Sequence, residues 1–150
     1  DAQESRGLGD VYKRQPTDKP VLLIGAGSGV VPLMAMIRQR RASAQAVPVA
    51  LLLSARTAED VLFSSELHLI EMSDPTFILT LAITREAPKR ASDYGRRIDD
   101  GMVQATIARL GRDPGHVFVC GSNGFVNIAT DSALSAGLGV SIIKTERYGG

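Results

Sequence analysis

Three glycines at alternate positions mark the segment of this chain with the clearest chemical potential. They directly follow the apolar run Val21–Ile24, and a second apolar run starts at Val30. This order is typical of a strand, a tight turn and a helix whose free N–H groups and positive dipole end point at the turn. We therefore expect an anion such as a pyrophosphate to bind there. The residues that would surround it are Gly25, Ala26, Gly27, Ser28, Gly29 and Pro32.

The spacing of these glycines separates the known classes of nucleotide-binding turn. The dinucleotide fingerprint G-x-G-x-x-G fits Gly25 and Gly27, but Val30 stands where the third glycine belongs. A P-loop needs a lysine after its glycines, and none follows here. Methyltransferases that use S-adenosylmethionine usually carry an acid late in the preceding strand, where this chain has Leu23 and Ile24. The remaining pattern is G-x-G-x-G-x-x-P, and a turn that serves packing alone is the alternative.

A hydroxyl and a guanidinium, those of Ser54 and Arg56, follow the second apolar run. Sites that select NAD usually place an acid at this point to bind the ribose 2′-hydroxyl, whereas Glu59 and Asp60 come later. Charge-assisted hydrogen bonds to a 2′-phosphate contribute roughly 1.5–3 kcal/mol each. We therefore expect NADPH to be favoured over NADH. In the alternative, NADH is also used and Arg56 is an ordinary exposed loop residue.

Further cations follow the third apolar run. Thr84 and Arg85 come directly after it, and Arg96 lies further along the same connection. These three residues are candidates for contacts near the adenosine half of a bound dinucleotide. The alternative is that Glu86 neutralises Arg85 in a surface ion pair of little energetic value.

The fourth apolar run ends in a cysteine beside a glycine, with a helical pattern after it. The residues concerned are Cys120, Gly121, Ser122, Asn123 and Phe125. A nucleophilic cysteine needs a basic partner, and neither His68 nor His116 falls at the carboxyl end of a predicted strand. A covalent mechanism is therefore not expected. Cys120 is predicted to position a flat ring, or else to be a small buried residue, and Ser122 suits a helix N-cap.

The elements that position these groups alternate between strand and helix. Strands are predicted at 21–25, 47–53, 77–83, 117–120 and 141–144, and helices at about 30–41, 58–72, 98–110 and 123–136. This alternation predicts an α/β fold, a three-layer Rossmann-like domain with a five-stranded parallel sheet and helices on both faces. Ligands bind at the carboxyl ends of such strands. The solvated end of the first helix is expected to carry Arg38, Arg40 and Arg41 as partners of its dipole.

Composition limits the function further. The 150 residues are 44% hydrophobic and 22% charged, with a net charge of +1, so no strong field recruits nucleic acid or an acidic membrane. No apolar run is long enough to span a membrane. A single cysteine excludes an internal disulfide framework and indicates a reducing, cytoplasmic compartment, and with two histidines it argues against a metal site.

The first residues differ in character from the remainder. Residues 1–19 are polar and lack apolar periodicity, so we expect a tail or linker there and a folded domain over 20–150. Within the tail, the stretch GDVYKRQ resembles a translated assembly junction, and we expect it to be partly non-native.

These segments together resemble the NAD(P)-binding domain of the ferredoxin–NADP reductase superfamily. They are GAGSGVVPLMAMIR, LLLSARTAEDVLFSSEL, TRE, GRRI, VCGSNGF and TERYGG. The resemblance implies that Cys120 and Gly121 lie beside the nicotinamide and that the Ser-x-Arg segment holds the 2′-phosphate. It also implies that Glu146 and Tyr148 lie near a flavin ring, which makes them, with Cys120, the candidate catalytic residues. Tyr148 as part of a frayed tail is the alternative.

Two details depart from the family pattern. Ser122 stands where the family commonly has proline, and the pair Arg96-Arg97 leaves open which arginine corresponds to that of the family. The flavin-binding β-barrel that precedes this domain in the family has no counterpart in residues 1–19. We expect the barrel, with its FAD or FMN, to lie outside these residues or in a partner.

The resemblance implies an NAD(P)H-dependent flavoprotein oxidoreductase. This chain would hold the nicotinamide for hydride transfer to the flavin, and the electrons would pass to an acceptor such as ferredoxin or an oxygenase component. One alternative is a nucleotide-binding fragment or regulatory module without turnover. A less favoured one is a methyltransferase that uses S-adenosylmethionine.

Overall fold

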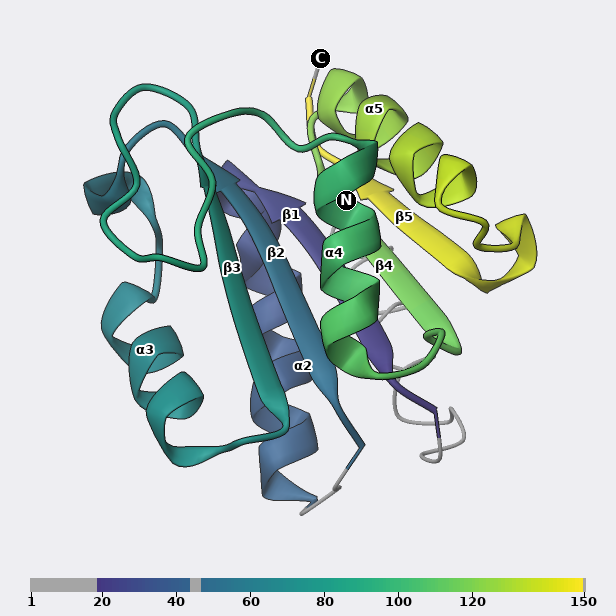
Figure 1. Cartoon of the computed structure of the whole chain (residues 1–150), viewed down its shortest axis with the longest axis horizontal. Helices are drawn as coiled ribbons and strands as arrows, with labels where there is room; N and C mark the ends of the chain where they lie inside the picture. The colour runs from purple at the N-terminus through teal and green to yellow at the C-terminus, as the bar shows by residue number, and fades with distance from the viewer. Residues whose placement is uncertain (1–18, 44–46, 150) are drawn as a thin grey trace.

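The computed structural model of the chain describes residues 19–43 and 47–149. Five parallel strands form one sheet in the order β3-β2-β1-β4-β5 (Figure 1). The strands are β1 (Val21–Ala26), β2 (Val49–Ala55), β3 (Phe77–Ile83), β4 (His116–Gly121) and β5 (Ile143–Arg147). The helices are α2 (Val30–Ala42), α3 (Ser64–Ser73), α4 (Asp100–Leu110) and α5 (Asn123–Ser135), with short 3-10 helices η1 (Gly27–Gly29), η2 (Ala58–Asp60) and η3 (Val140–Ile142). Apart from Lys19, the predicted tail falls outside the described residues.

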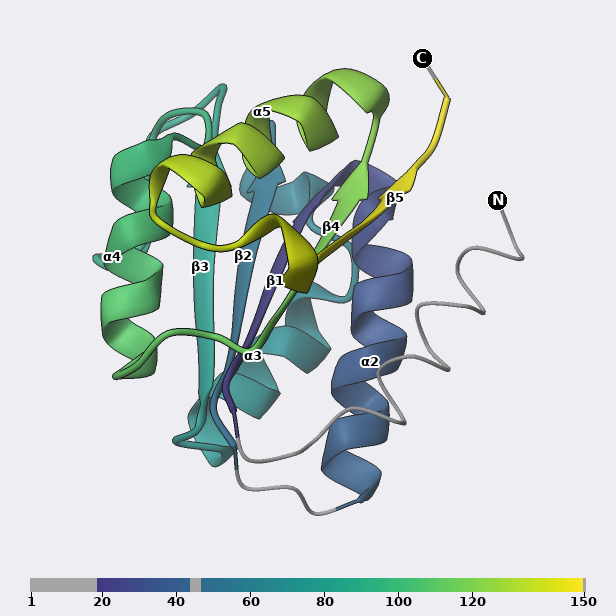
Figure 2. The same cartoon turned by 90° about the vertical axis from the view of Figure 1, so that its right-hand side faces the viewer.

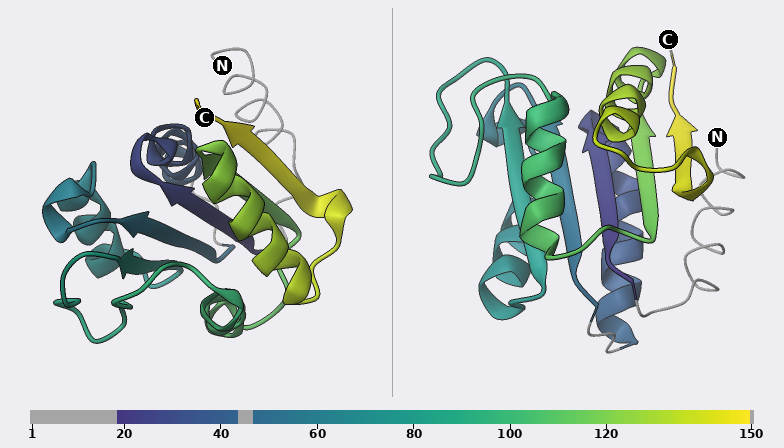
Figure 3. Two further views of the ribbon diagram at one scale, coloured as in Figure 1. Left: turned by 90° about the horizontal axis from the view of Figure 1, so that it is seen from above. Right: turned by 45° about the vertical axis from the view of Figure 1, so that its right-hand side comes forward.

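Helices cover both faces of the sheet, α2 and α3 on one and α4 and α5 on the other (Figures 2 and 3). Successive residues of β1 face opposite layers, because Leu23 packs into the α2 side of the core and Leu22 and Ile24 into the α4 side. Because both faces of the sheet are buried at β1 and β2, these strands are continuous apolar runs. The prediction of a three-layer α/β fold is confirmed.

The order of the strands creates a switch point beside β1. The chain moves from β1 outward through β2 and β3, then crosses back to β4 on the other side of β1. The pairing of β1 with β4 runs from Val21 opposite His116 to Gly25 opposite Cys120. The glycine turn and the segment after Cys120 therefore begin side by side at the carboxyl edge, where ligands bind in open α/β sheets.

One predicted helix is divided in the structure. The pattern over 58–72 predicts a continuous helix, but the chain forms η2 and then α3, with Phe63 at the N-cap of α3 in the left-handed conformation (φ 59°). Such a conformation is unfavourable for an aromatic residue. It is stabilised by packing, because the half-buried ring of Phe63 lies against the α2 side of the core. Local periodicity carries no signal of that tertiary contact.

The last strand also differs from the prediction. The sequence predicts a strand at 141–144, whereas β5 begins at Ile143 and pairs with β4 until Arg147 lies opposite Gly121. The exposed edge residues Lys144 and Thr145 hide this strand from a search for apolar runs. As a result Glu146 lies within the sheet and not in a tail. The remaining elements agree with their predicted limits to within two residues.

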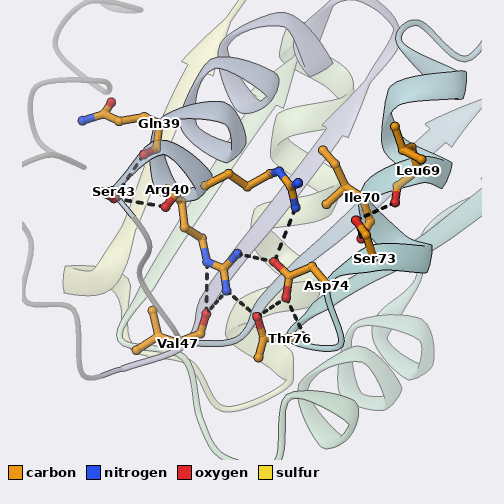
Figure 4. Close-up of polar contacts among 10 residues, drawn as sticks. Gln39, Arg40, Ser43, Val47, Leu69, Ile70, Ser73, Asp74 and Thr76 are labelled. Atoms are coloured by element: carbon orange, nitrogen blue, oxygen red, sulfur yellow. Dashed lines mark hydrogen bonds and ion pairs between the residues drawn. The ribbon is translucent and has the colours of Figure 1, made fainter.

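The role predicted for the arginines at the end of α2 is wrong for one of them. Arg40 is 1% exposed, and its guanidinium donates to the Val47 carbonyl (Nε to O, 3.1 Å), to Asp74 (3.1 Å) and to the Thr76 hydroxyl (2.6 Å) (Figure 4). Arg38 is exposed as expected and pairs with Glu66 of α3. Arg40 therefore connects the end of α2 to the segments that lead into β2 and β3. No local sequence pattern predicts this buried role.

This cluster predicts a pH-dependent stability. Burial would raise the pKa of the Asp74 carboxyl, but hydrogen bonds from the Thr76 hydroxyl and amide and from Arg40 outweigh it, so the pKa is lowered. A carboxyl with a lowered pKa in the folded state stabilises that state above its unfolded pKa, near 3.8, and loses this contribution as the pH falls further. We expect Asp74→Asn to reduce the free energy of unfolding by about 1–3 kcal/mol at pH 7.

Urea unfolding at pH 7 and pH 3 checks this expectation. The difference between Asp74→Asn and the unchanged chain should shrink at pH 3, while Asp113→Asn on an exposed loop should match the unchanged chain throughout. An equal difference at both pH values would contradict the assignment.

Candidate nucleotide-binding site

The three glycines of the turn differ in what an added Cβ would meet. Gly27 has a φ of +55° in open space, so its backbone conformation disfavours any other residue. A Cβ on Gly29 would lie 2.2 Å from the carbonyl oxygen of Cys120, because η1 passes directly over the end of β4. A Cβ on Gly25 would lie 2.8 Å from a leucine methyl of α2. Packing accounts for two glycines, and the exposed Gly27–Ser28 segment keeps its backbone available at the start of η1 and α2.

A groove of about 480 Å³ opens beside this turn, at the carboxyl edge of the sheet. Residues from the ends of β1 and β2, from the segments after β2, β3 and β4 and from α5 line it: Ala26, Ser54, Arg56, Thr84, Arg97, Ile98, Ser122, Gly124, Phe125 and Ile128. An adjoining hollow of about 360 Å³ shares four of these residues and adds Gly27, Ala55 and Asp60. The structure thus brings the glycine turn, Ser54, Arg56, Thr84, Ser122 and Phe125 together, as the argument from strand ends expects.

The lining of the groove includes both cations and apolar side chains. Arg56 and Arg97 are exposed cations on different loops, whereas Ile98, Phe125 and Ile128 provide apolar surface. Such a combination suits a ligand with phosphates at one side and a flat ring at the other. Asp60 lines the smaller hollow together with Arg56 and is the carboxylate among its lining residues.

Two other cations that were predicted to contact the nucleotide, Arg85 and Arg96, do not line the groove as Arg56 does. Arg96 does not line the groove: its guanidinium pairs with Asp99 (2.6 Å) and lies 4.8 Å from the centre of the Tyr94 ring. The hydrogen bond with Asp99 raises the pKa of Arg96 and, with the amide of Met102, lowers the pKa of Asp99. Arg85 lines neither hollow, although its amide donates to the carbonyl of Arg56 (2.9 Å).

The sequence left open which of Arg96 and Arg97 has the role of the family's arginine, and Arg97 is the one that lines the groove. One signal was available, since Asp99 caps α4 and sits three residues after Arg96, a spacing at which the two can pair. The apolar groove residues Ile98 and Ile128 were missed. Ile98 reads as the first apolar residue of a helix, and Ile128 as an exposed helical position.

Cys120 is more deeply placed than a residue at the rim of a ligand site. It is fully buried in the α2 side of the core and lines neither hollow. Burial, with a further contribution from nearby Glu146, raises the pKa of its thiol to about 12. The thiol is therefore protonated at neutral pH, so it does not act as a nucleophile. Its backbone carbonyl, not its sulfur, makes the close contact with Gly29.

The end of the described chain is tied to the segment after β4. The Tyr148 amide donates to the Gly121 carbonyl (2.8 Å), and the Tyr148 hydroxyl donates to Glu146 (2.8 Å). The Asn123 side-chain amide donates to the Gly149 carbonyl (3.0 Å). Glu146 is 1% exposed and lies opposite Cys120 in the ladder of β4 and β5. The three candidate catalytic residues thus meet at one place, and Tyr148 is not part of a frayed tail.

Capping at the start of α5 agrees with the sequence. The Ser122 hydroxyl accepts a hydrogen bond from the Phe125 amide (3.3 Å), as predicted for an N-cap.

Among residues 19–43 and 47–149, no His, Cys, Asp and Glu side chains gather in the groups of three that a metal site requires. In the same part of the chain, none of the helices has the length and apolar character of a membrane span.

Comparison with known proteins agrees with this geometry. Residues 23–131 match the family model described as the oxidoreductase NAD-binding domain. Ferredoxin–NADP reductase B of Sorangium cellulosum is 31% identical over 149 residues, covering 92% of this chain and 58% of that protein. An NADPH oxidoreductase of Mycobacterium tuberculosis is 30% identical over 130 residues, covering 86% of this chain and 31% of that protein. The chain therefore spans about half or less of the length of these relatives.

Solved structures show the same fold at lower identity. A ferredoxin NADP⁺ reductase from Neisseria gonorrhoeae with bound FAD and NADP superposes with a TM-score of 0.72 at 20% identity, over 90% of this chain and 58% of that one. A flavohemoglobin from Malassezia yamatoensis gives a TM-score of 0.77 at 22% identity, over 94% of this chain and 34% of that one. With the family model covering most of the chain, this protein belongs to the family of oxidoreductase NAD-binding domains.

Proposed function

We propose that residues 20–150 form the NAD(P)H-binding domain of a flavin-dependent oxidoreductase and that NADPH is the favoured nucleotide. The observation that carries this proposal is the groove itself. It joins a glycine turn at a helix start to Ser54 and Arg56 at the next strand end. That pairing of an anion-binding turn with a second cationic position fits a nucleotide with a pyrophosphate and a further phosphate.

Different residues of the groove would bind different parts of the nucleotide. The backbone of Gly27 and Ser28 would face the pyrophosphate at the start of α2, with the helix dipole adding to the attraction. Ser54 and Arg56 would bind the 2′-phosphate, and Thr84 with Arg97 would add polar contacts from the neighbouring loops. Ser54 lies at the end of β2, and Arg56 and Thr84 come directly after β2 and β3, so these groups are positioned by the sheet and would lose little conformational entropy on binding.

We further propose that Cys120 and Gly121 lie beside the nicotinamide end and that Glu146 and Tyr148 lie near the flavin ring. The side chain of Cys120 is buried and lines neither hollow, so it would support the ring site from below. When bound, NADPH supplies a hydride from C4 of the nicotinamide to a flavin. The chain orients the ring for that transfer and needs no general acid or base. The buried thiol of Cys120 is small and uncharged, and the hydrogen bond from Tyr148 to Glu146 holds the aromatic ring in place beside it.

The flavin and the electron acceptor lie outside the described residues in this proposal. We propose that a β-barrel elsewhere in the protein, or in a partner, holds FAD or FMN. Relatives named as reductase components of a naphthalene 1,2-dioxygenase system and of a propane 2-monooxygenase support an acceptor such as a ferredoxin or an oxygenase component. A cytoplasmic location fits such a partner.

Nucleotide titration tests the proposal directly. NADPH should bind the 150-residue chain and raise its thermal unfolding midpoint, with a weaker effect of NADH and none of S-adenosylmethionine. Fusion to the FAD-binding part of the Neisseria gonorrhoeae reductase, which was solved with bound FAD, should then give NADPH-dependent reduction of a dye. Stabilisation by S-adenosylmethionine alone would overturn the proposal. Binding of NADPH without dye reduction in a flavin-loaded fusion would favour a nucleotide-binding module without turnover.

A further inference from the structure

The segment from Asp93 to Asp99, here called the arm, leads from the edge of β3 to the start of α4 and carries Arg97 into the groove. In Figure 1 it is the last part of the long loop between β3 and α4. Its first residues continue the sheet. The Tyr94 amide donates to the Leu81 carbonyl (2.9 Å), and the Ile83 amide donates to the Tyr94 carbonyl (2.8 Å).

The side chain of Asp93 also attaches the arm to β3, because its carboxylate takes the place of a backbone carbonyl as hydrogen-bond acceptor. One of its carboxylate oxygens accepts a hydrogen bond from the Leu81 amide (2.9 Å), an edge-strand donor that a further strand would otherwise satisfy. The other oxygen lies 3.7 Å from Nε of Arg90, which itself pairs with Glu71 of α3 and donates to the Leu79 carbonyl. The Asp93 side chain is 2% exposed. A carboxylate this deeply buried is retained only with such partners.

The far end of the arm is fastened as well. Arg96 pairs with Asp99, and Asp99 accepts a hydrogen bond from the Met102 amide and so caps α4. Ile98 is 5% exposed and packs into the core on the α4 side. Arg97 stands between these two anchored residues, and its exposed side chain lines the groove.

We infer that Asp93 is a positioning residue for nucleotide binding, which holds the arm so that Arg97 meets a phosphate of the bound dinucleotide. This inference rests on the proposed function. The physical reason is pre-organisation: a cation on a mobile loop loses conformational freedom on binding, and ordering costs of this kind weaken affinity several-fold for each side chain. A loop already fixed to β3 and α4 avoids most of that loss.

A double-mutant cycle separates this role from a purely structural one. NADPH affinity of the 150-residue chain is measured by calorimetry for Asp93→Ala, Arg97→Ala and the combination. Arg97→Ala should weaken binding about tenfold, the loss of one charge-assisted hydrogen bond. Asp93→Ala should weaken it about fivefold, and the combined variant should bind no more weakly than Arg97→Ala alone. If the two losses multiply, Asp93 does not act through Arg97 and the inference fails.

Two controls complete the experiment. Combined with Arg56→Ala on a separate loop, Asp93→Ala should give multiplying losses, and Asp113→Ala should leave affinity unchanged. If Asp93→Ala does not fold, Asp93→Val replaces it, because valine fills the site but has no oxygen to accept from the Leu81 amide or to attract Arg90. Faster hydrogen exchange at the Tyr94 amide should accompany the weaker binding.

The outcomes distinguish this inference from the function on which it rests. Absence of NADPH binding by the unchanged chain overturns both. Normal binding by the unchanged chain, with unaltered affinity in a folded Asp93→Ala variant, overturns the positioning role alone.

Discussion

Replacement of Gly29 by alanine is expected to destabilise the protein and to remove most of its nucleotide binding. The new Cβ would lie 2.2 Å from the carbonyl oxygen and 2.6 Å from the carbonyl carbon of Cys120. Both partners are backbone, one in η1 and one in a strand paired on both sides, so neither can move without breaking hydrogen bonds. Overpacking of this kind costs about 1–3 kcal/mol. Because the turn must separate from β4, we also expect NADPH affinity to fall more than tenfold.

Urea unfolding and NADPH titration measure the two effects separately. Gly101→Ala is the matched control, since a Cβ there meets nothing closer than an Asp99 oxygen at 3.7 Å and alanine is the better helix former. The control should be at least as stable as the unchanged chain. A Gly29→Ala variant with the stability and affinity of the unchanged chain would show that the turn does not need its close approach to β4.

The second large effect concerns the choice between NADPH and NADH. Arg56→Ala should weaken NADPH binding tenfold or more and leave NADH binding nearly unaltered, because only NADPH carries the 2′-phosphate. Arg56 is exposed and lies on the loop after β2, so the free energy of unfolding should not change. The measurement is a pair of calorimetric titrations, one for each nucleotide.

Asp60 provides the companion variant for this test. It lines the hollow shared with Arg56, and its negative charge would oppose a 2′-phosphate while suiting the 2′-hydroxyl of NADH. We expect Asp60→Asn to leave NADPH affinity equal or higher and to weaken NADH. Equal losses for both nucleotides in Arg56→Ala would remove Arg56 from the 2′-phosphate site.

Local signals account for what the sequence predicted well. The buried parallel strands appear as continuous apolar runs, and the ends of the helices carry recognisable caps such as Asp99 and Ser122. Gly111 ends α4 with a φ of +85°, as expected for a glycine just after a helix. Weak local signals account for the errors, namely the division of the helix at Phe63 and the polar edge strand β5.

The sequence by itself determined the α/β architecture, the glycine turn and the gathering of Ser54, Arg56 and Phe125 at one edge. Each strand and helix is recognised from the periodicity of residues near one another in the chain. The gathering then follows from the rule that ligands bind where parallel strands end together. A local signal, the spacing of Arg96 and Asp99, also indicated that Arg97 and not Arg96 is free to line the groove. The tertiary structure alone decided that Arg40 is buried and that Asp93 fastens the arm. Each of these depends on partners brought together by packing, such as Thr76 for Arg40 and Leu81 for Asp93, which no local pattern specifies.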